Sequence, residues 1–307
     1  MLPEQLDPYP GDAVEHLRSF LLLARRIEAD PRGAFDATAL ALHLDASVLR
    51  RRVQTLGEWL GGDLLAGRGS RLRVTARGGR VVETAARVLA ELGRLREALA
   101  GAAAPVAIGA TGTVITELLP PALGAVRARW PEVEVRIRRS GTEASQELIR
   151  RGELDIAVVR GERPPPGFSH RRLCPDRLWA AIPTGHPLAR ARRIARRDLA
   201  APPIISYRPG SFTRRRVMEP LAPLGGRVHV EVDGKAAALR YVELGLGVAF
   251  LSLVPGHRVA AEGVRLREVT RHFPRAAFFL IWAPGRELRP TERFLVERLL
   301  AAVRVQR

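Results

Sequence analysis

The spacing of apolar residues predicts three helices at the start of the chain. Apolar side chains recur at helical spacing through residues 12–29, and Pro31 and Gly33 end that helix. A short second helix fits residues 37–42. A third begins near Asp45, whose carboxylate is an expected N-cap, and runs to residue 60, where a pair of glycines stops it.

The pattern then changes to two short extended runs. Residues 63–65 and 72–75 read as brief apolar strands, and the glycine, serine and arginine residues at 67–71 form the tip between them. The prediction is a β-hairpin that follows three helices, which is the order of elements in a winged helix-turn-helix.

One long helix is predicted from residue 76 to about residue 100. Its apolar positions alternate in spacings of four and three residues, as in the a/d seam of a heptad repeat: Val81, Ala85, Val88, Leu92, Leu95 and Leu99. Such a seam needs a partner helix to be buried, so we favour a dimerising linker helix. A core helix of a single chain has the same stripe over three turns, and this alternative stays open.

Beyond Pro105, apolar strands alternate with amphipathic helices, which is the rhythm of a parallel sheet covered by helices. The rhythm occurs twice, which predicts two α/β lobes with a ligand-binding cleft at the carboxyl ends of the strands. The expected strands are residues 106–110, 133–137, 154–159, 203–206, 228–232, 247–251 and 276–283. The expected helices are residues 114–128, 144–151, 212–221, 235–244 and 291–303.

Length and composition agree with several domains. At 307 residues the chain exceeds one comfortable core. We expect a winged helix-turn-helix domain in residues 1–75, a linker helix in residues 76–104 and a two-lobed α/β domain in residues 105–307. The acidic N-terminus does not resemble a signal peptide, and no apolar run approaches the ~20 residues that span a bilayer. A cytoplasmic protein is the expectation, with no membrane partner.

The formal charge of +18 suggests nucleic acid, but its distribution weakens that inference. Residues 1–75 contain ten arginines and ten acidic residues, so the excess of positive charge lies downstream. Lys235 is the only lysine, and a coding bias toward arginine explains much of the total. Net charge alone therefore does not establish DNA binding.

Local placement supports DNA binding better. In the predicted third helix, Val48, Leu49, Val53 and Leu56 are expected to face inward, packed with Ala39 and Leu42 of the second helix. The exposed N-terminal half then presents Ala46, Ser47, Arg50, Arg51 and Gln54. Arginine and glutamine read guanine and adenine edges in a major groove through paired hydrogen bonds.

Phosphate contacts are expected from Arg52 and from three wing arginines, Arg68, Arg71 and Arg73. A run of three arginines is more commonly the solvated face of an ordinary helix. The preceding turn, the following wing and the long helix together favour a DNA-binding surface.

The sequence resembles the LysR-type regulator family over nearly its whole length. The N-terminal resemblance lies in AFDATALALHLDASVLRRRVQTLGEWLGGDLLAGRGSRLRVTARGG, through Phe35, Ala39, Leu42, Leu44, Leu49, Val53, Leu56, Gly61, Leu64, Thr75 and Gly78. The C-terminal resemblance lies in LLPPALGAVRARWPEVEVRI, GELDIAVV, HPLA and VELGLGVAFL. It implies a regulator that binds operator DNA, responds to a small-molecule inducer and assembles as a homodimer or a homotetramer.

Several residues depart from the family pattern. The family usually has Ser, Gln, Pro and Ser at the positions of Asp45, Ala46, Ser47 and Arg50, and Phe and Arg at those of Leu65 and Gly67. Ala46 and Arg50 change the base-reading chemistry, so no operator preference is carried over.

Hydroxyl residues follow two predicted strands directly before helices. Thr111 and Thr113 lie after residues 106–110, and Ser140 and Thr142 lie after residues 133–137. Free amides and hydroxyls at a helix start favour an anion. In the resembled family these loops and the strand end near Ser206 line the effector cleft, so we predict an anionic effector there, with Asp233 at its side. Plain helix capping by the same residues is an equal alternative.

Other chemistries find no support in the sequence. The seven histidines lack metal-ligand spacing, and no nucleophile elbow, phosphate loop or dinucleotide loop is present, so no metal, cofactor or catalytic residue is predicted. The lone cysteine, Cys174, excludes an internal disulfide and reads as a buried filler. A periplasmic-type binding module, a metabolic α/β enzyme and a molybdate-type regulator are the alternatives, each less consistent with the pattern than a LysR-type regulator.

Overall fold

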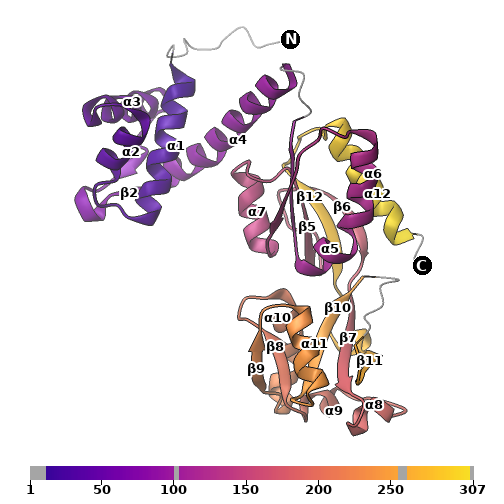
Figure 1. Cartoon of the computed structure of the whole chain (residues 1–307). Helices are drawn as coiled ribbons and strands as arrows, with labels where there is room; N and C mark the ends of the chain where they lie inside the picture. The colour runs from indigo at the N-terminus through magenta and orange to yellow at the C-terminus, as the bar shows by residue number, and fades with distance from the viewer. Residues whose placement is uncertain (1–11, 100–103, 255–260, 305–307) are drawn as a thin grey trace. The chain divides into compact units, whose positions relative to one another are not determined.

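Figure 1 shows the computed structural model of the chain, which describes residues 12–99, 104–254 and 261–304. These residues form two compact units. The first lies mainly within Met1–Gly101, and the second within Ala102–Ile149 and Leu154–Arg307. Each unit buries apolar clusters of its own.

The predicted N-terminal helices are confirmed. They are α1 (Ala13–Ala29), α2 (Ala34–Leu42) and α3 (Ala46–Trp59). Their apolar stripes converge in one core, where Phe20 and Leu23 of α1 meet Leu49 and Leu56 of α3, all fully buried. This packing fixes the direction in which the polar side of α3 faces.

Two sequence predictions about α3 are wrong. Val48 is 40% exposed, because it precedes the buried Leu49 by about 100° around the helix and so falls outside the inward stripe. Asp45 occupies the N-cap position with an extended backbone, but its side chain makes no capping hydrogen bond. The carboxylate therefore remains at the exposed start of α3.

The wing is a minimal hairpin of β1 (Leu65–Ala66) and β2 (Arg73–Val74), paired antiparallel around the single turn η1 (Gly69–Arg71). Gly67 makes this tight hairpin possible. It has a φ of +81°, and a Cβ atom there would lie 2.1 Å from the carbonyl oxygen of Arg71. The glycine that departs from the family pattern is thus required by the shape of this wing.

The long helix is confirmed as α4 (Ala76–Leu99). Gly78 lets it start close against the wing, since a Cβ atom there would lie 2.2 Å from the carbonyl oxygen of Leu64. Along the predicted seam, Ala85 is buried within the unit, whereas Val88 and Leu92 are 38% and 41% exposed. The side chains of Leu95 and Leu99 lie outside those described. Toward the C-terminal end of α4, the described seam residues therefore no longer pack in the core of the unit.

The first lobe of the second unit is a five-stranded sheet in the order β4-β3-β5-β12-β6. Its strands are β3 (Val106–Ala110), β4 (Val135–Arg139), β5 (Ile156–Gly161), β6 (Ser169–Pro175) and β12 (Ala277–Trp282). Helices α6 (Leu119–Arg129) and α12 (Pro290–Arg304) cover one face, and α7 (Thr142–Arg150) covers the other (Figure 1). Both faces of the sheet are therefore buried.

The second lobe repeats this layering with the strand order β11-β7-β10-β8-β9. Its strands are β7 (Arg177–Pro183), β8 (Ile204–Tyr207), β9 (Val228–Val232), β10 (Val248–Leu253) and β11 (Val264–Glu268). One face packs on α9 (Arg196–Ala200) and α10 (Phe212–Leu221), and the other on α11 (Lys235–Glu243); the short α8 (Pro187–Arg190) lies beside β7. The two-lobed α/β architecture is thus confirmed.

Both sheets are mixed, although the rhythm of strands and helices predicted parallel sheets. β3, β4 and β5 are parallel, as are β8, β9 and β10, but β12 runs antiparallel to β5 and β7 antiparallel to β10. The reversal arises because the chain passes from one lobe to the other at Asp176, between β6 and β7, and later returns to β12. Strands β6, β7 and β11 were not predicted. β6 and β11 are arginine-bearing edge strands with much of their length exposed, whereas β7 is a mostly buried inner strand that the sequence analysis missed.

The helix predicted over residues 114–128 is two helices, α5 (Gly112–Glu117) and α6, which meet at Leu118. Pro120 and Pro121 explain the break. Proline has no amide hydrogen for the preceding turn but fits the first turn of a new helix.

Replacing Gly67 with alanine should open the wing at a cost of about 1–3 kcal/mol, because the new Cβ atom clashes with the carbonyl oxygen of Arg71. The expected result is faster amide hydrogen exchange across residues 65–74, measured by mass spectrometry. Gly69→Ala is the matched control, since Gly69 also has a positive φ, +55°, but nothing lies within 4 Å of its Cβ position. Equal exchange in the two variants would contradict the role assigned to Gly67.

Candidate DNA interface and effector pocket

The N-terminal half of α3 presents a polar surface. Ser47, Arg50, Arg51 and Gln54 are exposed, and Ala46 is half-buried against the core of the unit. The guanidinium of Arg50 lies 4.4 Å from the centre of the Phe35 ring of α2. This cation–π contact restricts the long Arg50 side chain, and so it reduces the conformational entropy that the side chain would lose on binding a ligand.

Arg52 differs from its two neighbours in the arginine run. Its Nη1 donates to the Ser19 hydroxyl at 3.1 Å and lies 3.6 Å from the Glu15 carboxylate, and its side chain is only 22% exposed. Arg52 therefore holds α3 against α1. The sequence did not separate it from Arg50 and Arg51, since only the fold shows which arginine faces α1.

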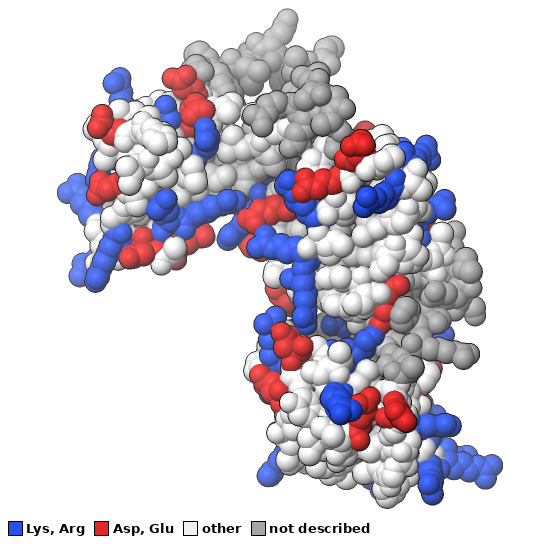
Figure 2. All heavy atoms as spheres, viewed as in Figure 1, with Lys and Arg blue, Asp and Glu red and all other residues white. Residues whose placement is uncertain are grey.

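The wing adds three exposed cations, Arg68, Arg71 and Arg73, all on the hairpin that follows α3. Figure 2 shows both blue and red side chains on the visible face of this unit, in agreement with its balanced charge. Positive charge is thus concentrated locally rather than across the unit.

In the second unit, the predicted effector residues of the first lobe lie at the carboxyl ends of β3 and β4. Thr111 precedes α5, and its Oγ1 atom is buried without a hydrogen-bond partner among the described residues. Thr113 is half-buried in α5. A buried hydroxyl without a partner is costly, and this makes Thr111 the least satisfied of the predicted hydroxyls.

The hydroxyls after β4 have partners within the protein. The Ser140 and Ser145 hydroxyls lie 2.7 Å apart. The Thr142 hydroxyl donates to the Arg160 carbonyl at 2.9 Å and accepts from the Arg160 amide at 3.2 Å. Thr142 thereby ties the start of α7 to the end of β5.

Ser206 and Asp233 belong to the second lobe. Ser206 is buried in β8. Asp233 accepts from Arg139 of the first lobe at 3.1 Å, and nearby Lys235 of α11 is paired with the buried Glu117 of α5. Burial lowers the pKa of Lys235. These two ion pairs connect the lobes. Of the predicted effector residues, Asp233 therefore takes part directly in a contact between the lobes.

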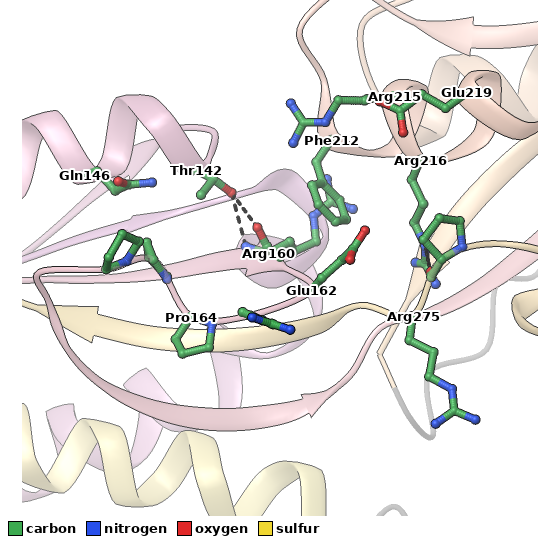
Figure 3. Close-up of a pocket in the computed structure, with 15 residues that line it drawn as sticks. Thr142, Gln146, Arg160, Glu162, Pro164, Phe212, Arg215, Arg216, Glu219 and Arg275 are labelled. Carbon is green, nitrogen blue, oxygen red and sulfur yellow. Dashed lines mark hydrogen bonds between the residues drawn. The ribbon is translucent and has the colours of Figure 1, made fainter.

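A pocket of about 420 Å³ lies at another place between the lobes. Thr142 is the only predicted effector residue on its surface. The lining comprises Thr142, Gln146, Arg160, Gly161, Glu162, Arg163, Pro164, Pro165, Pro166, Phe212, Arg215, Arg216, Glu219, Pro274 and Arg275. Figure 3 shows Arg160, Glu162 and Phe212 near its centre. Sequence analysis missed its arginines, because arginine is so frequent in this chain that the run at residues 214–216 carried no signal.

Behind this pocket lies a buried charge cluster on Asp176. Its carboxylate accepts from the Ser252 hydroxyl and faces two arginines, with Oδ2 3.2 Å from Arg216 and 3.8 Å from Arg160. Arg216 also donates to the backbone carbonyl of Pro274 at 2.8 Å. Burial lowers the pKa of Arg216, and the nearby carboxylate of Asp176 opposes that shift.

Tyr207, at the end of β8, adds a neutral polar group near the cluster. Burial raises the pKa of its phenol to about 12, although the charge of Arg160 opposes this shift. The phenol therefore stays protonated at neutral pH and does not supply a negative charge to balance the arginines.

The part of the chain that the structure describes contains no group of three His, Cys, Asp or Glu side chains able to hold a metal ion. None of the described helices has the length and apolar character needed to cross a lipid bilayer. Cys174 is 3% exposed on β6 and packs in the core of the first lobe, which confirms its reading as a buried filler.

A three-helix unit with a wing, followed by a long helix and a two-lobed α/β domain, defines a ligand-responsive DNA-binding regulator. The family described as "LysR substrate binding domain" matches residues 100–304. The chain belongs to the LysR-type transcriptional regulators, and it is a regulator rather than an enzyme.

Named relatives agree with this assignment. A probable hydrogen peroxide-inducible genes activator of Mycobacterium avium is 27% identical over 258 residues, covering 82% of this chain and 80% of the relative. The transcriptional regulator CbbR of Xanthobacter flavus is 30% identical over 240 residues, covering 75% and 70%. The crystal structure of full-length CbnR in complex with its target DNA matches with a TM-score of 0.58 and 20% identity, covering 96% and 99%.

Proposed function

We propose that α3 reads operator bases in the major groove. Arg50 and Gln54 would contact base edges, while Ser47, Arg51 and the small Ala46 would fit against the groove. The observation that carries this proposal is the exposed Arg50 guanidinium held on the Phe35 ring, since a pre-positioned arginine suits bidentate recognition of guanine. That CbnR has been solved with its target DNA supports a similar use of this fold.

The phosphate contacts in this proposal come from the wing. Arg68, Arg71 and Arg73 are exposed on a short hairpin beside α3, where their charges would meet the backbone of the duplex. Arg52 was predicted to join them. Its bonds to Ser19 and Glu15 favour a positioning role, in which it holds α3 at the angle that the groove requires.

We also infer that the regulator acts as a homodimer or homotetramer built through α4, in the cytoplasm, where operator DNA lies. The supporting observation is that Val88 and Leu92 are well exposed on a heptad seam whose earlier positions are packed. On this basis we retain the organisation into a DNA-binding domain at residues 1–75, a linker helix at 76–104 and an effector domain at 105–307.

The effector, in our proposal, is a small anion held in the cleft between the lobes by Thr111, Thr113, Ser140, Thr142 and Ser206, with Asp233 at the edge. The unpartnered buried hydroxyl of Thr111 supports this site most directly. The net positive charge of the residues downstream of residue 75 agrees with an anionic ligand.

Arg50→Ala is expected to relax base preference by about 1–3 kcal/mol at one operator position, because the bidentate contact with a base is lost. Arg71→Ala should weaken binding to all sequences about equally and reduce its dependence on salt. Mobility shifts on the protein's own upstream DNA and on random DNA, over a range of salt concentrations, measure both effects. Equal losses on both DNAs from the two variants would contradict the assigned roles.

Leu92→Arg is expected to dissociate the dimer, because it places a charge in the α4 seam. Loss of the second DNA-binding unit should lower operator affinity about tenfold or more. Sedimentation equilibrium measures the association state. Glu83→Arg is the control, since Glu83 lies on the opposite side of α4 and the substitution also adds an arginine. A dimer that survives Leu92→Arg unchanged would rule out this seam.

A thermal-shift screen of small organic acids tests the cleft. A bound anion at 100 times its Kd should stabilise the full-length protein by about 2.7 kcal/mol. Thr111→Val should remove that gain without destabilising the free protein, because the buried hydroxyl has no partner to lose. Thr116→Val is the control, as the Thr116 hydroxyl bonds only within its own helix. No effect of Thr111→Val on stabilisation by any anion would remove Thr111 from the site.

A further inference from the structure

The second lobe carries a dense group of arginines at the end that includes α8. Between β7 and β8 the chain passes through α8 and α9, and five of the eight residues from 190 to 197 are arginine. Figure 2 shows blue side chains projecting from this end of the lobe, where Figure 1 places α8. The exposed side chains of this group, here called the arginine patch, are Arg190, Arg192, Arg193, Arg196, Arg197 and Arg271.

Apolar anchors fix the backbone beneath the patch. Ala189, Ile194 and Leu199 follow one another at intervals of five residues and are buried in the core of the lobe, and the arginines between them lie at the surface. Arg267 of β11 donates to the Ala189 carbonyl at 3.2 Å, and His272 hydrogen-bonds the backbone of Ile194. The arginines are therefore presented on a fixed surface, which lowers the entropy lost when they bind a partner.

His272 shows that the fold brings two separate segments together in this patch. Burial lowers the pKa of its imidazole, and the charges of Arg271 and Arg196 lower that pKa further. Arg271, in the short turn η3 (Thr270–His272), also donates from Nε to Nε2 of His272 at 3.2 Å. Arg196 begins α9, far from η3 in the sequence. The patch is therefore more than a local run of arginines.

The positive charge of the patch lacks counter-charges in the protein. Asp198 is the only acidic residue from 184 to 198. Its carboxylate accepts from the Ala195 amide at 2.8 Å and approaches Arg197 only to 3.8 Å. Among the residues that the structure describes, the first four arginines of the run form no ion pair. Their charges are therefore available to an external anion.

The side chains around the arginines narrow the class of partner. No Phe, Tyr or Trp occurs from residue 184 to residue 198, so the patch lacks the aromatic surface on which the bases of a single strand stack. Leu188 is half-buried and Ile194 is buried, so no large apolar side chain is free to enter a lipid bilayer. Guanidinium groups contact phosphates through paired hydrogen bonds, which suits the backbone of a duplex.

We propose that the arginine patch binds the phosphate backbone of double-stranded DNA without reading its sequence. The effector domain would then supply a DNA contact of its own, in addition to those of α3 and the wing. Because phosphate contacts carry no base information, this contact would raise the affinity for all sequences alike. The inference rests on the proposed operator binding, since that binding brings a duplex to the protein.

Protection of arginines from phenylglyoxal tests the proposal on the full-length wild-type protein. With a random-sequence duplex at about ten times its Kd, modification of Arg192 and Arg193 should fall about tenfold, since only the free protein reacts. Peptide mass spectrometry measures the modification at each residue. Arg127 and Arg171, exposed in the first lobe, are the controls and should react as without DNA. Unprotected Arg192 and Arg193 on a bound duplex would overturn the proposal.

The same spectra separate this inference from the operator proposal, because they also report Arg50 and Arg51 of α3. Protection of Arg50 and Arg51 without protection of Arg192 and Arg193 overturns the patch and leaves the α3 contact intact. Protection of Arg192 and Arg193 alone supports the patch and contradicts the α3 contact.

Two other polyanions test the choice of duplex DNA. Poly-glutamate and vesicles that contain phosphatidylserine are added at the same concentration of negative charge as the duplex. Weaker protection of Arg192 and Arg193 by both supports a duplex as the partner. Stronger protection by poly-glutamate or by the vesicles would overturn the proposal and indicate an acidic protein or a membrane instead.

A variant that combines Arg192→Gln, Arg193→Gln and Arg197→Gln should bind a random duplex with a weaker dependence on salt. Each phosphate contact contributes about 0.9 to the slope of log Kobs against log salt concentration, so the slope should become shallower by about 2 to 3. All three side chains are exposed, so folding should be retained, which circular dichroism verifies.

The matched control combines Arg127→Gln, Arg171→Gln and Arg172→Gln. These arginines are also exposed, and their replacement removes the same charge from the first lobe. The control should keep the wild-type slope to within about one contact, or about 0.9. Equal slopes in the patch variant and the control variant would overturn the proposal.

Discussion

The junction between the two lobes depends on one buried carboxylate, that of Asp176, which contacts residues of both lobes. Asp176 lies where the chain passes from β6 in the first lobe to β7 in the second, and it bonds to Ser252 at the end of β10. Arg216 and Arg160 bring α10 and β5 to the same point. Four elements from both lobes therefore meet on one buried side chain. Removing this carboxylate would leave the charges of two buried arginines, Arg160 and Arg216, without the counter-charge that they share, so the junction should be costly to disrupt.

Much of the fold follows from local sequence signals. The helical spacing in α1, the a/d pattern of α4 and the apolar runs of β3, β5 and β10 each reflect burial on a face that the sequence reveals directly. The strand directions do not. Whether β12 runs parallel or antiparallel to β5 depends on where the chain changes lobes, and a single charged residue at that crossing carries no periodic signal.

The candidate sites show the same limit more sharply. Exposed positions on α3 were predicted because the inward stripe excludes them, but the fold was needed to tell Arg52, bonded to Ser19, from Arg50, stacked on Phe35. The pocket lined by Arg160 and Arg216 escaped sequence analysis for a related reason. A buried arginine is a good indication of a site. The sequence alone does not show which of the 49 arginines are buried. Only the pairing with Asp176 separates Arg160 and Arg216 from the rest.

Lys235 has a practical consequence. Every other cationic side chain in the protein is arginine, which does not react as a primary amine, and this one lysine pairs with Glu117 across the two lobes. An amine-directed label would therefore have a single internal target. Its rate of modification would depend on the contact with Glu117, because a paired and partly buried amine is less accessible to the reagent than a free one. The chain thus contains a natural internal reporter of the Lys235–Glu117 contact, readable by mass spectrometry without engineering.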